Sequence, residues 1–173
     1  MAEPIGNDAT GYDVLTAAMK SLLNQFPGLY PDEVIKFEEL GSEDGIAFSN
    51  DSGALVYTEK EDILGRIYQE CRYPCFVVYR STTGARERQK ITILEFLDTL
   101  GRWLCHEPSG IEGKEYEKAI YPDLTAGRRV ERVTRGNAYG TQPQENGVQD
   151  WFYRLRFFIK MLSSLKFKKG KKQ

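Results

Sequence analysis

The neighbouring residues Cys105 and His106 are the first candidates for chemistry, because an imidazole beside a thiol can activate it as a nucleophile. Both lie near the end of a segment expected to be helical. Neighbours on a helix point about 100° apart and do not face each other. An imidazolium at a helix C-terminus also interacts well with the helix dipole, which favours a structural role. A small thiol-dependent enzyme using this pair remains the alternative.

Metal binding is the second possibility, and the spacing of the candidate ligands argues against it. Cys71 and Cys75 are four residues apart in a segment expected to be a strand, so they lie about 13 Å apart on one face. That separation exceeds the roughly 7 Å between Cα atoms that a disulfide tolerates. A structural zinc site needs about four ligands, and the two cysteines have no second ligand pair. The acidic cluster Glu59, Glu61 and Asp62 lacks the ligand spacing of a calcium-binding loop. We expect buried, reduced cysteines and no metal, no cofactor and no enzymatic activity.

Arginines form the most distinctive cluster in the chain. They occupy two neighbouring strand-like segments: Arg128, Arg129, Arg132 and Arg135, then Arg154 and Arg156. One interpretation is a solvated sheet face with cross-strand pairing to acids. The other is a charged subunit interface or channel lining, since planar guanidinium groups bind carboxylates well. A third hypothesis is a nucleic-acid-binding module that combines this cluster with the lysines of the C-terminal tail.

The elements that position these residues follow from hydrophobic periodicity. Apolar residues at helical spacing predict amphipathic helices over 11–26 and 90–106, and alternation predicts strands over 34–40, 46–48, 54–57, 63–80, 128–139 and 151–160. Residues 58–62 are expected to form a charged loop. Pro74 lacks a ladder donor, so its strand should be an edge or bulge there. The sum predicts an α+β fold, a mostly antiparallel sheet covered on one face by two helices.

The bulk properties suit a single domain. The chain has 173 residues and a net charge of -1, so no global field requires a nucleic-acid partner. No stretch approaches the roughly 20 apolar residues that span a bilayer, so we expect no membrane partner. We expect a flexible lead over residues 1–10, one α+β domain over 11–163 and a basic flexible tail over 164–173.

Four segments of the chain carry a pattern that is specific as a whole. They are "IAFSNDSGALVYTEKEDILGRIYQECRYPCFVVYR" (46–80), "ITILEFLDTLGRWLC" (91–105), "YPDLTAGRRVERVTRGNAYG" (121–140) and "VQDWFYRLRFFI" (148–159). Their order resembles a family of bacteriophage minor capsid proteins encoded in the neck region, the tail terminators. The resemblance spans roughly residues 12 to 160 and is a pattern over the whole chain rather than a catalytic signature.

The resemblance implies a structural virion protein of the tail or neck, assembled in the bacterial host cytoplasm. It implies a homohexameric ring that caps the head-proximal end of the tail tube and ends its polymerisation. The implied partners are the tail tube protein, the sheath protein if the tail is contractile, the head-completion or stopper protein, and DNA passing through the lumen. Another neck component, a stopper or adaptor, is the near alternative. The loop with Arg86, Arg88 and Lys90 is then a candidate contact with tube or neck.

Overall fold

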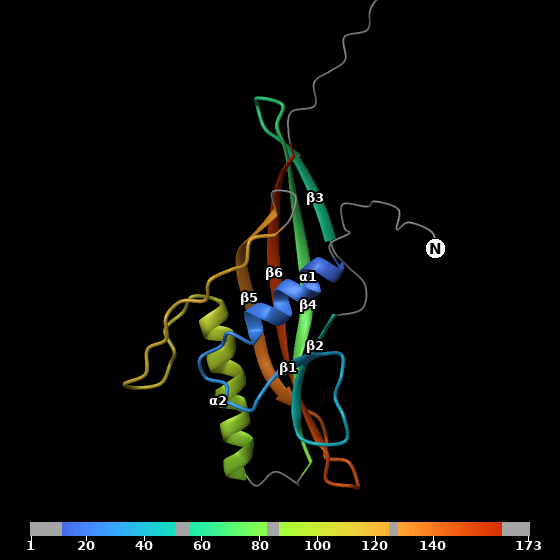
Figure 1. The fold of residues 1–173 in the computed structure, drawn as a ribbon, viewed down its shortest axis with the longest axis vertical. Coiled ribbons are helices and arrows are strands. Elements are labelled where there is room, and N and C mark those ends of the chain that lie inside the picture. Colours follow the sequence, from blue (N-terminus) through green and yellow to red (C-terminus); the bar gives the residue numbers. More distant parts are fainter. Residues whose placement is uncertain (1–11, 51–55, 83–86, 125–127, 164–173) are drawn as a thin grey trace, which may run out of the picture.

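The computed structural model describes residues 12–50, 56–82, 87–124 and 128–163. It contains two helices and six strands, joined in the order helix, four strands, helix, two strands (Figure 1). Their bounds are α1 Tyr12–Leu23, β1 Ile35–Phe37, β2 Gly45–Asn50, β3 Val56–Glu61, β4 Ile67–Ser81, α2 Glu87–Leu104, β5 Arg128–Gly140 and β6 Gln149–Ser163. No helix in these ranges is long and apolar enough to cross a membrane.

The six strands form one mixed sheet in the order β1-β2-β4-β6-β5, with β3 also paired to β4. Only the β1–β2 pair is parallel among the strand pairs of the described chain. The long strands β4 and β6 pair along their full lengths and form the spine of the sheet. The predicted α+β fold with a mostly antiparallel sheet is therefore confirmed.

Strand β4 is central in the sheet, with β6 on one side and β2 and β3 on the other. On one side, β6 pairs with it continuously, and Pro74 lies opposite Arg156. On the other side, β2 pairs only from Cys75 onward and β3 only up to Arg72. Because no described strand pairs with Pro74 on that side, its missing N–H costs no ladder bond there. The expectation of an edge or bulge at this proline stays a prediction, because residues 51–55, which join β2 to β3, lie outside the described residues.

The expected charged loop over 58–62 was placed too early, because β3 continues to Glu61. The reversal falls instead at Asp62, whose carboxylate accepts hydrogen bonds from the backbone N–H of Leu64 (2.8 Å) and Arg66 (2.9 Å). An aspartate that binds backbone donors two and four residues ahead closes a tight turn. The charged residues Lys60 and Glu61 of β3 are exposed, and β4 is the only described strand that pairs with β3.

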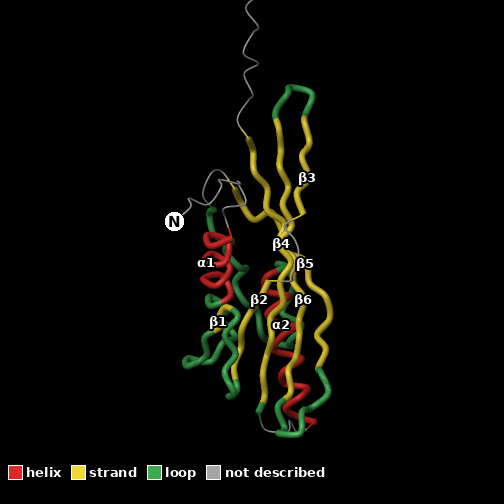
Figure 2. The backbone as a smooth tube through the Cα atoms, turned by 90° about the vertical axis from the view of Figure 1, so that its right-hand side faces the viewer, coloured by secondary structure: helices red, strands yellow, loops and turns green. Residues whose placement is uncertain are grey.

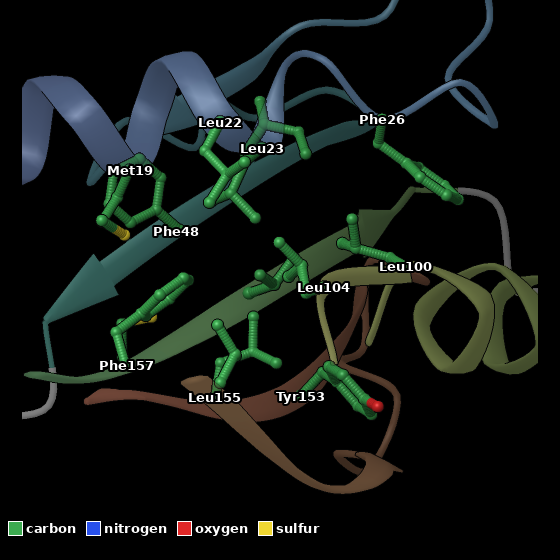
Figure 3. Close-up of a cluster of buried hydrophobic side chains, with 14 of the residues drawn as sticks. Met19, Leu22, Leu23, Phe26, Phe48, Leu100, Leu104, Tyr153, Leu155 and Phe157 are labelled. Atoms are coloured by element: carbon green, nitrogen blue, oxygen red, sulfur yellow. The ribbon is translucent and has the colours of Figure 1, made fainter. Parts of the chain in front are cut away.

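Both helices pack on the same face of the sheet. Figure 3 shows α1 contributing Met19, Leu22 and Leu23, while Leu100 and Leu104 come from α2. These side chains meet the inward residues of the sheet, among them Phe48, Tyr153, Leu155 and Phe157, all fully buried. In Figure 2, turned by 90°, α1 lies to one side of the strands, while α2 overlaps them in this view. Neither described helix packs on the opposite face of the sheet, where Arg72, Arg154 and Arg156 are exposed. We call that side of the sheet the uncovered face.

Candidate functional site

The uncovered face of β4, β6 and β5 carries most of the basic side chains of the sheet. Strand pairing places Arg72, Phe158 and Arg132 in one row across the three strands, and Glu70, Lys160 and Arg129 in the next. We call six residues of this surface the arginine face: Arg72, Arg129, Arg132, Arg154, Arg156 and Lys160. All of them are exposed or half-exposed.

A β-bulge brings the arginines of β5 onto this face. Residues three apart in a regular strand point to opposite sides, so Arg129 and Arg132 should diverge. The register shifts between Val130 and Arg132, however, and Glu131 is the extra residue. A bulge puts two residues opposite one and resets the alternation. Arg129 and Arg132 therefore share the uncovered face.

Aromatic rings hold the guanidinium groups of this face in place. The Cζ atom of Arg132 lies 3.7 Å from the ring centroid of Phe158, and that of Arg72 lies 5.6 Å from the same ring. The Cζ atom of Arg154 likewise lies 5.0 Å from the ring centroid of Phe76. A guanidinium stacked on a ring keeps its N–H edge free for a carboxylate or phosphate. The stacked guanidinium groups of the face are thus held in fixed orientations.

Few acids offset these charges. Lys160 contacts Glu131 at 3.4 Å and lies opposite Glu70 in β4. Within the described ranges no carboxylate lies within ion-pair distance of Arg132 or Arg156. Cross-strand pairing with acids, the first interpretation of the arginines, therefore does not account for Arg132 and Arg156. No described carboxylate balances the charge of these two side chains, and this part of the face suits an anionic partner.

A second bulge of β5, between Arg135 and Ala138, hollows one end of the face. Here a polar cavity of about 400 Å³ lies between β5 and β6, lined by Phe76, Arg154, Arg156 and the bulge residues 134–137. Tyr139 borders it and stacks on Phe152, with ring centroids 5.6 Å apart. The cavity is large enough to take an acidic side chain between two guanidinium groups.

Arg135 lies on the opposite, helix-covered face and links β5 to α2. It forms an ion pair with Asp98 and another with Glu107 at 2.9 Å, and Asp98 also binds Arg102 at 2.6 Å. Burial lowers the pKa of Arg135, but its hydrogen bonds to Tyr153 and Glu107 outweigh that effect, and the net pKa is raised. This arginine therefore serves the attachment of α2, apart from the arginine face.

The remaining predicted residues are scattered. Arg128 lies opposite Met161 at the start of β5, on the helix-covered side by register. Arg86 falls outside the described residues. Arg88 and Lys90 belong to the first turn of α2 instead of a loop, because the helix begins at Glu87. The helix dipole favours an acidic residue such as Glu87 at the start of a helix. Arg and Lys are good helix formers, so Arg88 and Lys90 fit in the first turn.

Cys105 and His106 directly follow α2, and the His106 ring is held by partners outside the helix. His106 Nε2 lies 2.8 Å from the carbonyl oxygen of Ala119, and its ring stacks on Tyr121 with centroids 4.6 Å apart. Burial raises the pKa of the Cys105 thiol to about 11. A nucleophilic cysteine needs a lowered pKa, so this thiol is poorly suited to that role. Cys71 and Cys75 are buried and form no disulfide, and no metal-binding group of residues occurs in the described ranges.

Two residues of the face were missed from the sequence, Arg72 and Lys160. The signal was present in the alternation of β4: Arg72, Pro74, Phe76 and Val78 occupy one side, against Cys71, Tyr73, Cys75 and Val77 on the buried side. Combining that alternation with the alternation of β6 would have assembled the face, had the pairing of the two strands been known.

Comparison with known proteins adds little to this geometry. No protein-family model and no curated protein matches the chain. Among solved structures, the chain is similar to one from the virion of a native gene transfer agent particle. The identity is 8 %, the match covers 84 % of this chain and 96 % of that chain, and the TM-score is 0.45. A likeness at this level carries no argument about fold or role.

Proposed function

We propose that this protein is a structural component of a phage-like virion, a tail terminator that assembles into a hexameric ring. The ring caps the head-proximal end of the tail tube, ends its polymerisation and joins the tail to the head. The proposal takes its direction from the resemblance of residues 12–160 to that family. It places the protein in the virion neck, with assembly in the host cytoplasm.

One structural observation supports an assembly role above all. The sheet is covered by helices on one face only, and its other face presents the arginine face with few offsetting acids. A rigid, charged and uncovered sheet surface is typical of a contact surface between proteins, where oriented guanidinium groups give specificity. The tail tube protein, the head-completion protein and, in a contractile tail, the sheath protein are the proposed partners of the ring.

The state of the one thiol–imidazole pair supports a non-enzymatic role. The His106 ring is held by Ala119 and Tyr121, and burial raises the pKa of the Cys105 thiol to about 11. We therefore rank a thiol-dependent enzyme below every assembly role. A stopper or adaptor of the same neck remains the nearest alternative, because a fold does not by itself fix a role.

Tube polymerisation in vitro tests the proposal. The tail tube protein from the same genome is polymerised alone and with this protein at increasing molar ratio, and tube lengths are measured by negative-stain electron microscopy. A terminator shortens the tubes in proportion to its concentration and produces them with one blunt, capped end. Unchanged tube lengths, with this protein free in the supernatant, would rule the terminator role out.

The second candidate is a nucleic-acid-binding module, which the same arginine face favours. Binding through six basic side chains would be steeply salt-dependent, because each neutralised phosphate releases counterions. Titration of a fluorescent DNA oligonucleotide at several salt concentrations separates the two functions. Tight binding with a steep salt slope, together with unaltered tubes, would favour this second candidate.

A further inference from the structure

A second charged surface lies around β1, and its sign is opposite to that of the arginine face. Five exposed acids flank this short strand: Asp32, Glu38, Glu39, Glu43 and Asp44. Lys36 is the one basic residue between positions 30 and 44. We call residues 30–44 the acidic segment. It also exposes Tyr30 (67 %) and Val34 (56 %), so apolar surface accompanies the charge.

The acidic segment is held in shape by contacts with the sheet. Asp44 accepts hydrogen bonds from the backbone N–H (2.5 Å) and hydroxyl (2.7 Å) of Thr82, and the N–H of Glu38 donates to the Phe48 carbonyl at 2.9 Å. The Arg80 guanidinium also donates to the Gly41 carbonyl at 2.8 Å. These bonds tie the segment to β2 and β4. A cavity of about 560 Å³ lies along it. The carboxylates of the segment are therefore presented on a fixed scaffold.

The two surfaces lie at opposite edges of the sheet. The strand order runs from β1, inside the acidic segment, to β5, inside the arginine face. Figure 2 shows β1 and its flanking loops on one side of the molecule and β5 with β6 on the other. Two surfaces so separated cannot pair within one chain. They can pair between chains, and every copy then keeps one free surface of each kind.

The covered rings of the arginine face favour carboxylates over nucleic-acid bases as its ligand. Proteins that follow single strands stack successive bases on free aromatic faces. Here the Phe158 ring is covered by two guanidinium groups and is 7 % exposed, and Arg154 covers Phe76. Tyr139 is 53 % exposed, but a single ring offers no track for a strand. Arg132 and Arg156 are exposed and have no ion-pair partner in the described ranges, and their guanidinium N–H edges pair well with carboxylates.

We infer that the arginine face of one copy binds the acidic segment of a second copy, in a head-to-tail contact. This inference rests on the proposed function, since it names the surfaces through which the ring would form. A heterologous contact of this kind closes into a ring when the rotation between copies divides a full turn. Charge complementarity fixes the register of the contact, while Tyr30 and Val34 supply apolar area to it.

Charge reversal on each side tests the contact. Arg129→Glu with Arg156→Glu reverses the arginine face without touching the two cation–π arginines over Phe158. Glu39→Lys with Glu43→Lys reverses the acidic segment without disturbing Asp44 or the Glu38 backbone. Lys118→Glu, at an exposed position of the connector after α2, is the control for charge alone. Circular dichroism and urea unfolding establish that each variant is folded.

Self-association is measured by light scattering and sedimentation at low ionic strength and high protein concentration, with and without the tube protein. Each double reversal is expected to weaken it by about tenfold or more, since two attractive pairs become repulsive. Lys118→Glu is expected to match wild type. Mixing the two reversed variants restores association through the unaltered surface of each. A chain that carries all four substitutions restores it fully, because both surfaces change sign together.

The outcomes separate this inference from the proposed function. A wild-type multimer that neither reversal weakens overturns the inference and leaves the ring proposal standing. A wild-type chain that stays monomeric in every condition overturns both. If reversal of the arginine face abolishes DNA binding while reversal of the acidic segment leaves the mass unchanged, the face is a nucleic-acid site and the inference is wrong.

Discussion

Replacing Gly101 by alanine should destabilise the protein, although the sequence alone predicts the opposite. Gly101 lies inside α2, where glycine weakens a helix by about 1 kcal/mol relative to alanine. A Cβ atom built at this position would lie 2.5 Å from ring carbons of Tyr153 and closer still to its hydroxyl oxygen. Tyr153 is fully buried, and its hydroxyl lies 3.4 Å from Arg135 Nη1, so the ring has no free space to enter.

The size of the effect follows from these two opposed contributions. Inserting a methyl group into a packed core typically costs 1–3 kcal/mol, and here the obstacle is a rigid ring, which puts the cost near the upper end. After subtracting the gain in helix propensity, we expect a loss of about 2 kcal/mol in the free energy of unfolding. For a chain of this length the melting temperature should fall by roughly 4–8 °C.

Urea unfolding followed by circular dichroism measures this loss, and a Tyr153→Leu background provides the control. Without the tyrosine ring the added methyl group has space, so Gly101→Ala should then be neutral or stabilising by up to about 1 kcal/mol. The difference between the two backgrounds isolates the clash. Stabilisation by Gly101→Ala in the wild-type background would refute the close seating of α2 on β6.

Three further predictions concern the far end of α2. Burial raises the pKa of Cys105 to about 11 and that of Tyr153 to about 12, so the folded state holds protons that the unfolded state releases above about pH 9. The urea midpoint should therefore fall as the pH rises from 9 to 12, and a midpoint that rises instead would contradict this burial. His106 has φ 59° in the helix-ending position, where glycine is favoured. Since both variants lose the ring contacts, His106→Ala should be less stable than His106→Gly by about 1 kcal/mol in urea unfolding; equal stabilities would argue against the left-handed backbone. Asp98→Asn should cost about 1 kcal/mol, because it weakens the ion pairs with Arg135 and Arg102, and this loss should shrink in an Arg135→Met background, where only the Arg102 pair remains to be weakened; an undiminished loss would argue against the Arg135 pair.

The local patterns of the chain predicted its elements well. Strict alternation over 151–160 matches β6, whose alternate residues from Trp151 to Ile159 are buried. The two amphipathic helices were expected on one face of the sheet, where they lie. What stayed out of reach was strand order, because pairing depends on long-range packing that no local pattern records. Two hydrogen bonds between the Asn24 side chain and the Ile35 backbone, at 2.8 and 2.9 Å, were equally out of reach. They join the end of α1 to β1, and no local pattern in the sequence indicates them.

The arginine face was predicted in part. Arg154 and Arg156 follow the alternation of β6, so their common side was foreseeable. The arginines of β5 were grouped as one cluster, but the first bulge brings Arg129 and Arg132 onto the face, and the regular alternation after it turns Arg135 to α2. A bulge adds one residue to a strand without a distinctive sequence signal, and it reverses the side of every residue after it.

We propose above all that this protein works by assembly at the end of a tail tube. Cryo-electron microscopy of tubes polymerised with this protein tests that proposal most directly. The expected result is a ring of identical copies at one tube end, with the arginine face of each copy against the acidic segment of its neighbour. Bare tube ends, with the protein in excess and remaining monomeric, would contradict it.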